Sequence, residues 1–124
     1  MIDKKQQEII RKFAGKIDET KPAALNNLGV FYYTKEMFID AIESFKKAIA
    51  LDNKYFLAYT NLGITIKKLL ETEAVSDEIE YEKDIDEKHN YTYDDVNEIF
   101  KTAIKLKPAL DTTYNNLGEV YYHI

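Results

Sequence analysis

A three-residue motif, Asn-Leu-Gly, occurs three times in this chain of 124 residues. Its copies end at Gly29, Gly63 and Gly118, so the step from position 29 to position 63 is 34 and the step from 63 to 118 is 55. A longer motif that begins Phe-Lys occurs at Phe45 and again at Phe100, and its step is also 55. Two separate motifs therefore agree on a repeating unit of roughly 34 residues. One copy of the unit carries an insertion, which accounts for the difference of 21 between the two steps and lies between Gly63 and Val96.

Each unit has the residue spacing of two amphipathic helices. Leu25, Leu28 and Tyr32 follow one another at intervals of three and four residues, which places them on one side of a helix. Thr92 and Asp95 have the spacing of a capping box at the start of a later helix, with Asp in place of the usual Glu or Gln. The pattern predicts helices over residues 3–17, 22–34, 37–51, 55–70, 93–107 and 111–123.

The small residues of the repeat have a physical purpose. Two antiparallel helices approach closely only where side chains are small, and Gly29, Ala41 and Ala48 provide such positions in the first unit. One helix pair cannot bury both of its faces, so neighbouring pairs must stack on one another. The N-terminal helix is expected to have one apolar face, formed by Ile9, Ile10, Phe13 and Ile17.

The order of these residues resembles the tetratricopeptide repeat family, in which Leu-Gly, Tyr, Ala, Phe, Ala and Pro recur over roughly 34 residues. The first unit matches at Leu28, Gly29, Tyr32, Ala41, Phe45 and Ala48, and has Asn53 where Pro is usual. The second unit matches at Leu62, Gly63, Phe100, Ala103 and Pro108, with Ile66 in place of Tyr and Val96 in place of Ala. The third unit matches at Tyr114, Leu117, Gly118 and Tyr121 and has only its first helix.

The resemblance implies an all-α fold, an α-solenoid in which antiparallel helix pairs stack into a superhelix. About two and a half repeats would follow an N-terminal helix. The chain, residues 1–124, would then be a single domain with an N-terminal helix (1–20), repeat one (22–55), repeat two (56–110) with an acidic insertion at about 71–91, and a half repeat (111–124).

The resemblance also implies a concave groove, lined by the first helix of each pair, that binds a peptide or a helix of a partner protein. The positions expected to face this groove are Asn26, Asn27, Val30, Tyr33, Thr60, Asn61, Ile64, Lys67, Asn115, Asn116, Glu119 and Tyr122. Asn27, Asn61 and Asn116 would form a ladder of amides, which both donate and accept hydrogen bonds and so suit a peptide backbone. The alternative is that these Asn residues only bond neighbouring helices.

One group of relatives holds the acidic C-termini of chaperones with a clamp of Lys and Arg. The clamp positions are occupied here by Asn26, Thr112 and Asn116, and Val30 replaces a clamp Asn. An acidic chaperone tail is therefore not expected as the ligand.

The insertion is strongly acidic. Residues 71–90 contain nine acids and two bases, a net charge of −7 in a chain whose total is −5, so the remaining residues sum to +2. We expect the insertion to be a solvent-exposed acidic segment, in which Ser76 could cap a short helix. The alternative hypothesis is that it is a docking element for a basic partner. Asp84, Asp86 and Asn90 are only faintly like a calcium loop, and no metal is expected.

No catalytic or cofactor-binding motif is present in the sequence. The chain has no Cys, and neither of its two His residues, His89 and His123, has a metal-ligand or nucleophile pattern beside it. We therefore expect a non-catalytic interaction module, an adaptor without a cofactor. The alternatives are a self-assembly scaffold, joined through the uncovered apolar side of the C-terminal helix, and a targeting domain of a larger enzyme.

The charge and hydropathy of the chain set its expected surroundings. The net charge of −5 argues against nucleic acid as a partner. The longest uncharged stretches, residues 22–34 and 55–66, are too short to cross a bilayer, and the start lacks the apolar core of a signal peptide. A cytoplasmic location is the expectation.

Overall fold

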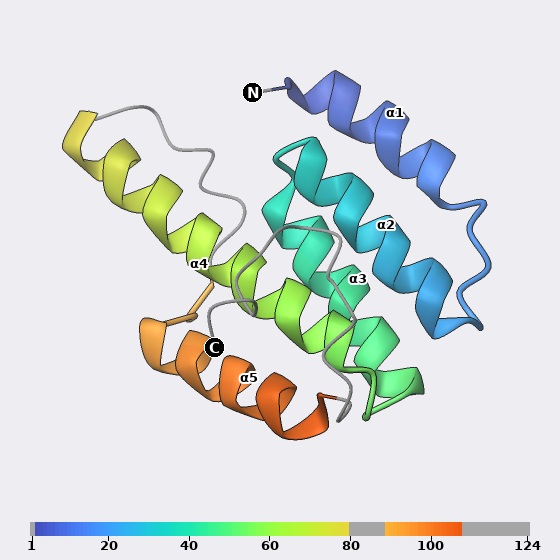
Figure 1. Ribbon diagram of the computed structural model, residues 1–124. Helices are drawn as coiled ribbons and strands as arrows, with labels where there is room; N and C mark the ends of the chain where they lie inside the picture. The colour runs from blue at the N-terminus through green and yellow to red at the C-terminus, as the bar shows by residue number, and fades with distance from the viewer. Residues whose placement is uncertain (1, 80–88, 108–124) are drawn as a thin grey trace.

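The computed structural model describes residues 2–79 and 89–107, and the regular secondary structure of these residues is helical (Figure 1). The helices are α1 (Lys4–Ala14), α2 (Pro22–Thr34), α3 (Phe38–Leu51), α4 (Phe56–Ile79) and α5 (Tyr93–Leu106). No strand occurs in these ranges. The half repeat expected at residues 111–124, with its proposed role in self-association, lies outside the described residues.

The helices pack in chain order. α2 packs against α3 and α4 packs against α5, which makes two helix pairs, and α3 packs against α4 to join the pairs. A smaller contact links the two first helices, α2 and α4. This arrangement confirms the predicted all-α solenoid of helix pairs over the described part of the chain.

The glycine of each repeated motif lies against the phenylalanine ring of the paired helix. A Cβ atom added at Gly29 would lie 2.6 Å from Cδ1 of Phe45, and one added at Gly63 would lie 2.6 Å from Cε1 of Phe100. Both distances are too short for real atoms, so only glycine allows the ring to sit there. The same contact therefore forms in both pairs, although the insertion separates Gly63 from Phe100 along the chain.

The core centres on α3, which lies between α2 and α4. Phe45, Ala41 and Ala48 are completely buried on α3, and Ile66 of α4 is completely buried as well. The small alanines allow the neighbouring helices to come close, and the large ring fills the space beside them. The repeat pattern of small and large residues thus specifies one continuous interior shared by both pairs.

α4 is longer than the sequence predicted. The helix was expected to end at residue 70, but it continues to Ile79 and so includes the first part of the insertion. No Gly or Pro interrupts this stretch, and Thr72 turns its hydroxyl back onto the carbonyl of Lys68 rather than breaking the helix. Ser76 lies within α4 and does not cap a separate helix.

The start of α5 agrees with the sequence. The Thr92 hydroxyl accepts a hydrogen bond from the Asp95 N–H, and the Asp95 carboxylate accepts one from the Thr92 N–H. This reciprocal capping satisfies backbone donors that a helix leaves free at its first turn. The predicted capping box is confirmed.

The N-terminal helix packs differently from the prediction. The expected apolar face does not turn inward as a unit, because Ile9 and Phe13 remain 60% and 73% exposed while Ile10 is half-buried against the core. The reason is a polar anchor on another side of α1: the Arg11 guanidinium forms two hydrogen bonds, of 3.0 and 2.9 Å, with the Asp40 carboxylate of α3. A bidentate pair of this kind fixes the rotation of α1 about its axis.

The glycine–ring contact generates a stability prediction. Gly29→Ala should lower the free energy of unfolding by about 1–3 kcal/mol, since the new methyl group overlaps a ring that is completely buried. Gly63→Ala should lower the free energy of unfolding by a smaller amount, because Phe100 is only half-buried and its ring has room to shift. Urea unfolding followed by circular dichroism measures both.

Gly15→Ala is the matched control. Gly15 has a helical φ of −62°, and an added Cβ there would meet only ordinary contacts at 3.5 Å or more. Its unfolding free energy should stay within about 0.5 kcal/mol of the parent. If Gly29→Ala were as stable as Gly15→Ala, the proposed packing of α2 on α3 would be wrong.

Candidate protein-interaction surface

The two first helices, α2 and α4, are joined by a buried pair of amides. Nδ2 of Asn61 donates a hydrogen bond of 3.0 Å to Oδ1 of Asn26, and both residues are buried, with exposed fractions of 0% and 1%. A polar pair in this position is directional, so it favours one register of α4 against α2 over others. For Asn61, this contact supports the alternative that the amide bonds a neighbouring helix.

The residues predicted to face a groove are split by burial. Asn27 and Lys67 are exposed, and Val30 and Tyr33 are half-buried. The buried members are Asn26, Thr60, Asn61 and Ile64. Only the first four can contact a partner without movement of the helices. The remaining positions, Asn115, Asn116, Glu119 and Tyr122, lie outside the described residues.

The predicted amide ladder is uneven in the first two units. Asn27 and Asn61 occupy the same position in the repeat, yet Asn27 is exposed and Asn61 is completely buried. The difference arises because Asn61 lies opposite an amide of the preceding unit, Asn26, whose oxygen accepts its hydrogen bond in the interior. The equivalent positions of Asn27 and Asn61 in the repeat do not reveal this difference in burial, because burial depends on which residue of the neighbouring helix lies opposite.

Tyr33 lies close to the charged part of α4. Its ring packs edge-on against Phe38, with 5.5 Å between ring centroids. Burial raises the pKa of the Tyr33 hydroxyl, and the negative charge of Glu71 raises it further.

The first helices α2 and α4 together present a mixed polar and apolar surface, here called the α2–α4 surface. It consists of Asn27, Val30 and Tyr33 of α2 and of Lys67 and Glu71 of α4.

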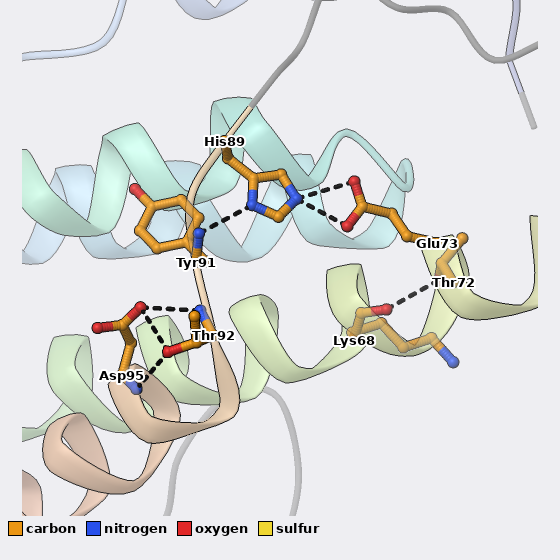
Figure 2. A network of polar contacts seen from close by, with 7 residues as sticks. All are labelled: Lys68, Thr72, Glu73, His89, Tyr91, Thr92 and Asp95. Atoms are coloured by element: carbon orange, nitrogen blue, oxygen red, sulfur yellow. Dashed lines mark hydrogen bonds and ion pairs between the residues drawn. The ribbon is translucent and has the colours of Figure 1, made fainter. Parts of the chain in front are cut away.

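A second polar cluster forms where the chain returns from the insertion, and Figure 2 shows its contacts. Nε2 of His89 lies 2.7 and 2.8 Å from the two carboxylate oxygens of Glu73, on the extended part of α4. Nδ1 of the same ring accepts a hydrogen bond of 3.0 Å from the Tyr91 N–H. Because a backbone N–H can only donate, Nδ1 carries no proton, and the Nε2–H donates to Glu73.

The return segment (residues 89–92) is also held by α3. The Lys46 amine of α3 contacts the Tyr91 hydroxyl and lies 4.7 Å from the centre of the Tyr91 ring. The His89 ring stacks on the Tyr91 ring with 5.4 Å between their centroids. The return segment is therefore fixed to both α3 and α4 before α5 begins. The sequence shows no metal-ligand or nucleophile pattern at His89, and it does not reveal this contact either, because no spacing rule connects Glu73 with His89 across an insertion.

Comparison with known families identifies the first helix pair. Residues 22–55 match the family model of the tetratricopeptide repeat. This first helix pair is a tetratricopeptide repeat. The match covers α2, α3 and the connection to α4, the unit in which Gly29 meets Phe45. No curated protein matches the chain.

Tetratricopeptide repeats mediate interactions between proteins, and the family is typically a non-catalytic interaction module. Among the residues that the structure describes, no helix has the length and apolar character needed to pass through a bilayer. For a chain that contains this repeat, the question is therefore which of its surfaces could contact another protein.

The buried amide pair generates a prediction for this repeat protein. Asn26→Ala and Asn61→Ala should each lower the unfolding free energy by about 1–3 kcal/mol, since each leaves the other amide buried without its partner. The double variant should cost less than the sum of the two single variants. Urea unfolding of the four proteins forms the cycle, with exposed Asn27→Ala as a control expected within about 0.5 kcal/mol of the parent. Strict additivity would show that the amides do not interact.

The position of Tyr33 generates a titration prediction. Its raised pKa means that folding favours the neutral phenol, so its contribution to stability is intact below the pKa of an unfolded Tyr, about 10, and is lost as the pH rises through the higher folded value. Glu71→Gln should lower the pKa of Tyr33, because a neighbouring negative charge is removed. Ultraviolet difference titration against Tyr33→Phe isolates this residue, and an unchanged titration in Glu71→Gln would place Glu71 far from the phenol.

Proposed function

We propose that the α2–α4 surface binds a peptide or a helix of a partner protein, and that the chain acts as a non-catalytic adaptor. The observation that carries the proposal is the grouping on adjacent first helices of exposed Asn27 and Lys67 with half-buried Val30 and Tyr33. Side chains that are half-buried in the free protein are already restricted. Little further side-chain entropy is therefore lost when a ligand binds to them.

The chemistry of this surface suits a peptide with both apolar and polar groups. Tyr33 offers an apolar ring and a hydroxyl, a combination that is frequent among the residues that dominate binding energy. The Asn27 amide both donates and accepts, so it can bond a peptide backbone irrespective of sequence. Lys67 and Glu71 carry opposite charges, which favours a partner without a strong net charge at this site.

Selection of ligands from a random peptide library tests the proposal. Peptides retained by the parent chain are synthesised with a fluorescent label, and their dissociation constants are measured by anisotropy. Tyr33→Ala should weaken binding by about 1–2 kcal/mol, and Asn27→Ala combined with Lys67→Ala should weaken it by a similar amount.

The matched control is Lys101→Ala combined with Asn97→Ala, on exposed positions of α5. This variant removes a Lys and an Asn as the test variant does, but outside the α2–α4 surface, and it should bind as the parent does. Circular dichroism of each variant verifies that the fold is kept. Selected peptides whose affinity responds to the α5 variant and not to the α2–α4 variants would refute the proposed surface.

A further inference from the structure

The described residues line a cavity on a different side of the helix pairs, between the second helices α3 and α5. Its volume is about 540 Å³, within the range of pockets that bind small ligands or several side chains. One wall comes from α3, the other from α5, and Ile66 of α4 lies at the floor. The return segment forms one side with His89, Asn90 and Tyr91. We call this cavity the α3–α5 pocket.

The wall formed by the return segment is held in place from two helices. Glu73 of α4 holds His89, and Lys46 of α3 holds Tyr91 through both its hydroxyl and its ring (Figure 2 shows the His89 contacts). The His89 side chain is only 10% exposed. A pocket whose wall is anchored in this way is formed before a ligand arrives, which reduces the entropy lost on binding.

The floor and lower walls of the pocket are apolar. Ile39 and Ile42 of α3, Ile66 of α4 and Ile99 of α5 contribute four branched aliphatic side chains. They offer no hydrogen-bonding group, so a polar ligand group placed there would lose its water without compensation. The interior of the pocket therefore suits a large apolar side chain.

The rim carries unbalanced negative charge. Two of the charged groups at the rim already have hydrogen-bond partners. The Lys46 amine donates to the Tyr91 hydroxyl, and the Asp95 carboxylate accepts from the N–H and hydroxyl of Thr92 at the N-terminal cap of α5. Glu43 on α3 has no ion pair among the described residues. Glu98 on α5 makes only an exposed 3.4 Å contact with Lys101, a kind of pair that contributes little. Two carboxylates on opposite walls thus remain available for a cation.

We propose that the α3–α5 pocket binds a segment of a partner protein in which a large apolar side chain is flanked by Arg or Lys. The apolar side chain occupies the isoleucine-lined interior, and the flanking cations pair with Glu43 and Glu98 across the rim. Arg suits this role because its guanidinium can bind a carboxylate through two parallel hydrogen bonds. This site is separate from the α2–α4 surface and does not depend on it.

The probe is a labelled synthetic peptide library with the fixed pattern Arg-apolar-Arg, in which the apolar position is Leu, Ile, Met or Phe. Binding to the full chain is measured by fluorescence anisotropy. Two reference libraries differ in one feature each: Glu-apolar-Glu reverses the charge, and Arg-Ser-Arg removes the apolar side chain. Arg-apolar-Arg should bind most tightly. Equal binding of Arg-Ser-Arg would show attraction to the acidic surface in general and would overturn the proposal.

Charge variants locate the site. Glu43→Gln and Glu98→Gln should each weaken binding of Arg-apolar-Arg roughly threefold, and the double variant about tenfold, as expected for partly exposed ion pairs. Glu8→Gln on α1, an exposed acid away from the pocket, is the matched control and should leave the affinity unchanged. All three positions are exposed, so these variants should keep the fold.

Backbone amide shifts in nuclear magnetic resonance spectra give a reading that is independent of affinity. The peptide should shift the amides of Tyr91 and Ile99 and leave those of Asn27 and Lys67 in place. Shifts at Asn27 and Lys67 instead would assign the peptide to the α2–α4 surface and refute the pocket. Failure of the whole Arg-apolar-Arg library to bind would refute it as well.

Discussion

The contact of a phenylalanine ring with a bare glycine backbone is the interaction on which the rest of this structure depends. It occurs between Gly29 and Phe45 in the first helix pair and between Gly63 and Phe100 in the second. A ring seated against the backbone sets both the distance between the two helices and their register along their axes. Once both pairs share that geometry, α3 can pack against α4, and the buried amides of Asn26 and Asn61 can meet.

The insertion adds new structure beside the second helix pair and leaves the contact between Gly63 and Phe100 intact. Part of it continues α4 as far as Ile79, and its last residues return along α3 and α4 to the cap of α5. The return is secured by polar contacts of Glu73 and Lys46, on helices that the repeat has already positioned. The insertion thereby forms one side of the α3–α5 pocket, and this gives an otherwise regular repeat a feature of its own.

The helix pairs were predictable from the sequence because spacing carries the necessary information. The recurrence of Gly29 and Phe45 as Gly63 and Phe100 reports a local contact that is the same in each unit. The end of α4 was not predictable in the same way, since the helix-forming residues of the insertion lack a periodic pattern. The inward position of Asn61 and the anchor at His89 each depend on a partner from another helix, and no single-sequence pattern encodes such a partner.

The central claim is that the second helix pair closes across its insertion as the first pair does without one. Nuclear Overhauser effects between the Gly63 α-protons and the Phe100 ring protons test this claim directly. We expect strong effects there, similar to those between Gly29 and Phe45 in the same sample. Strong effects for Gly29 with Phe45 but none for Gly63 with Phe100 would show that the insertion breaks the repeat, and would contradict the account.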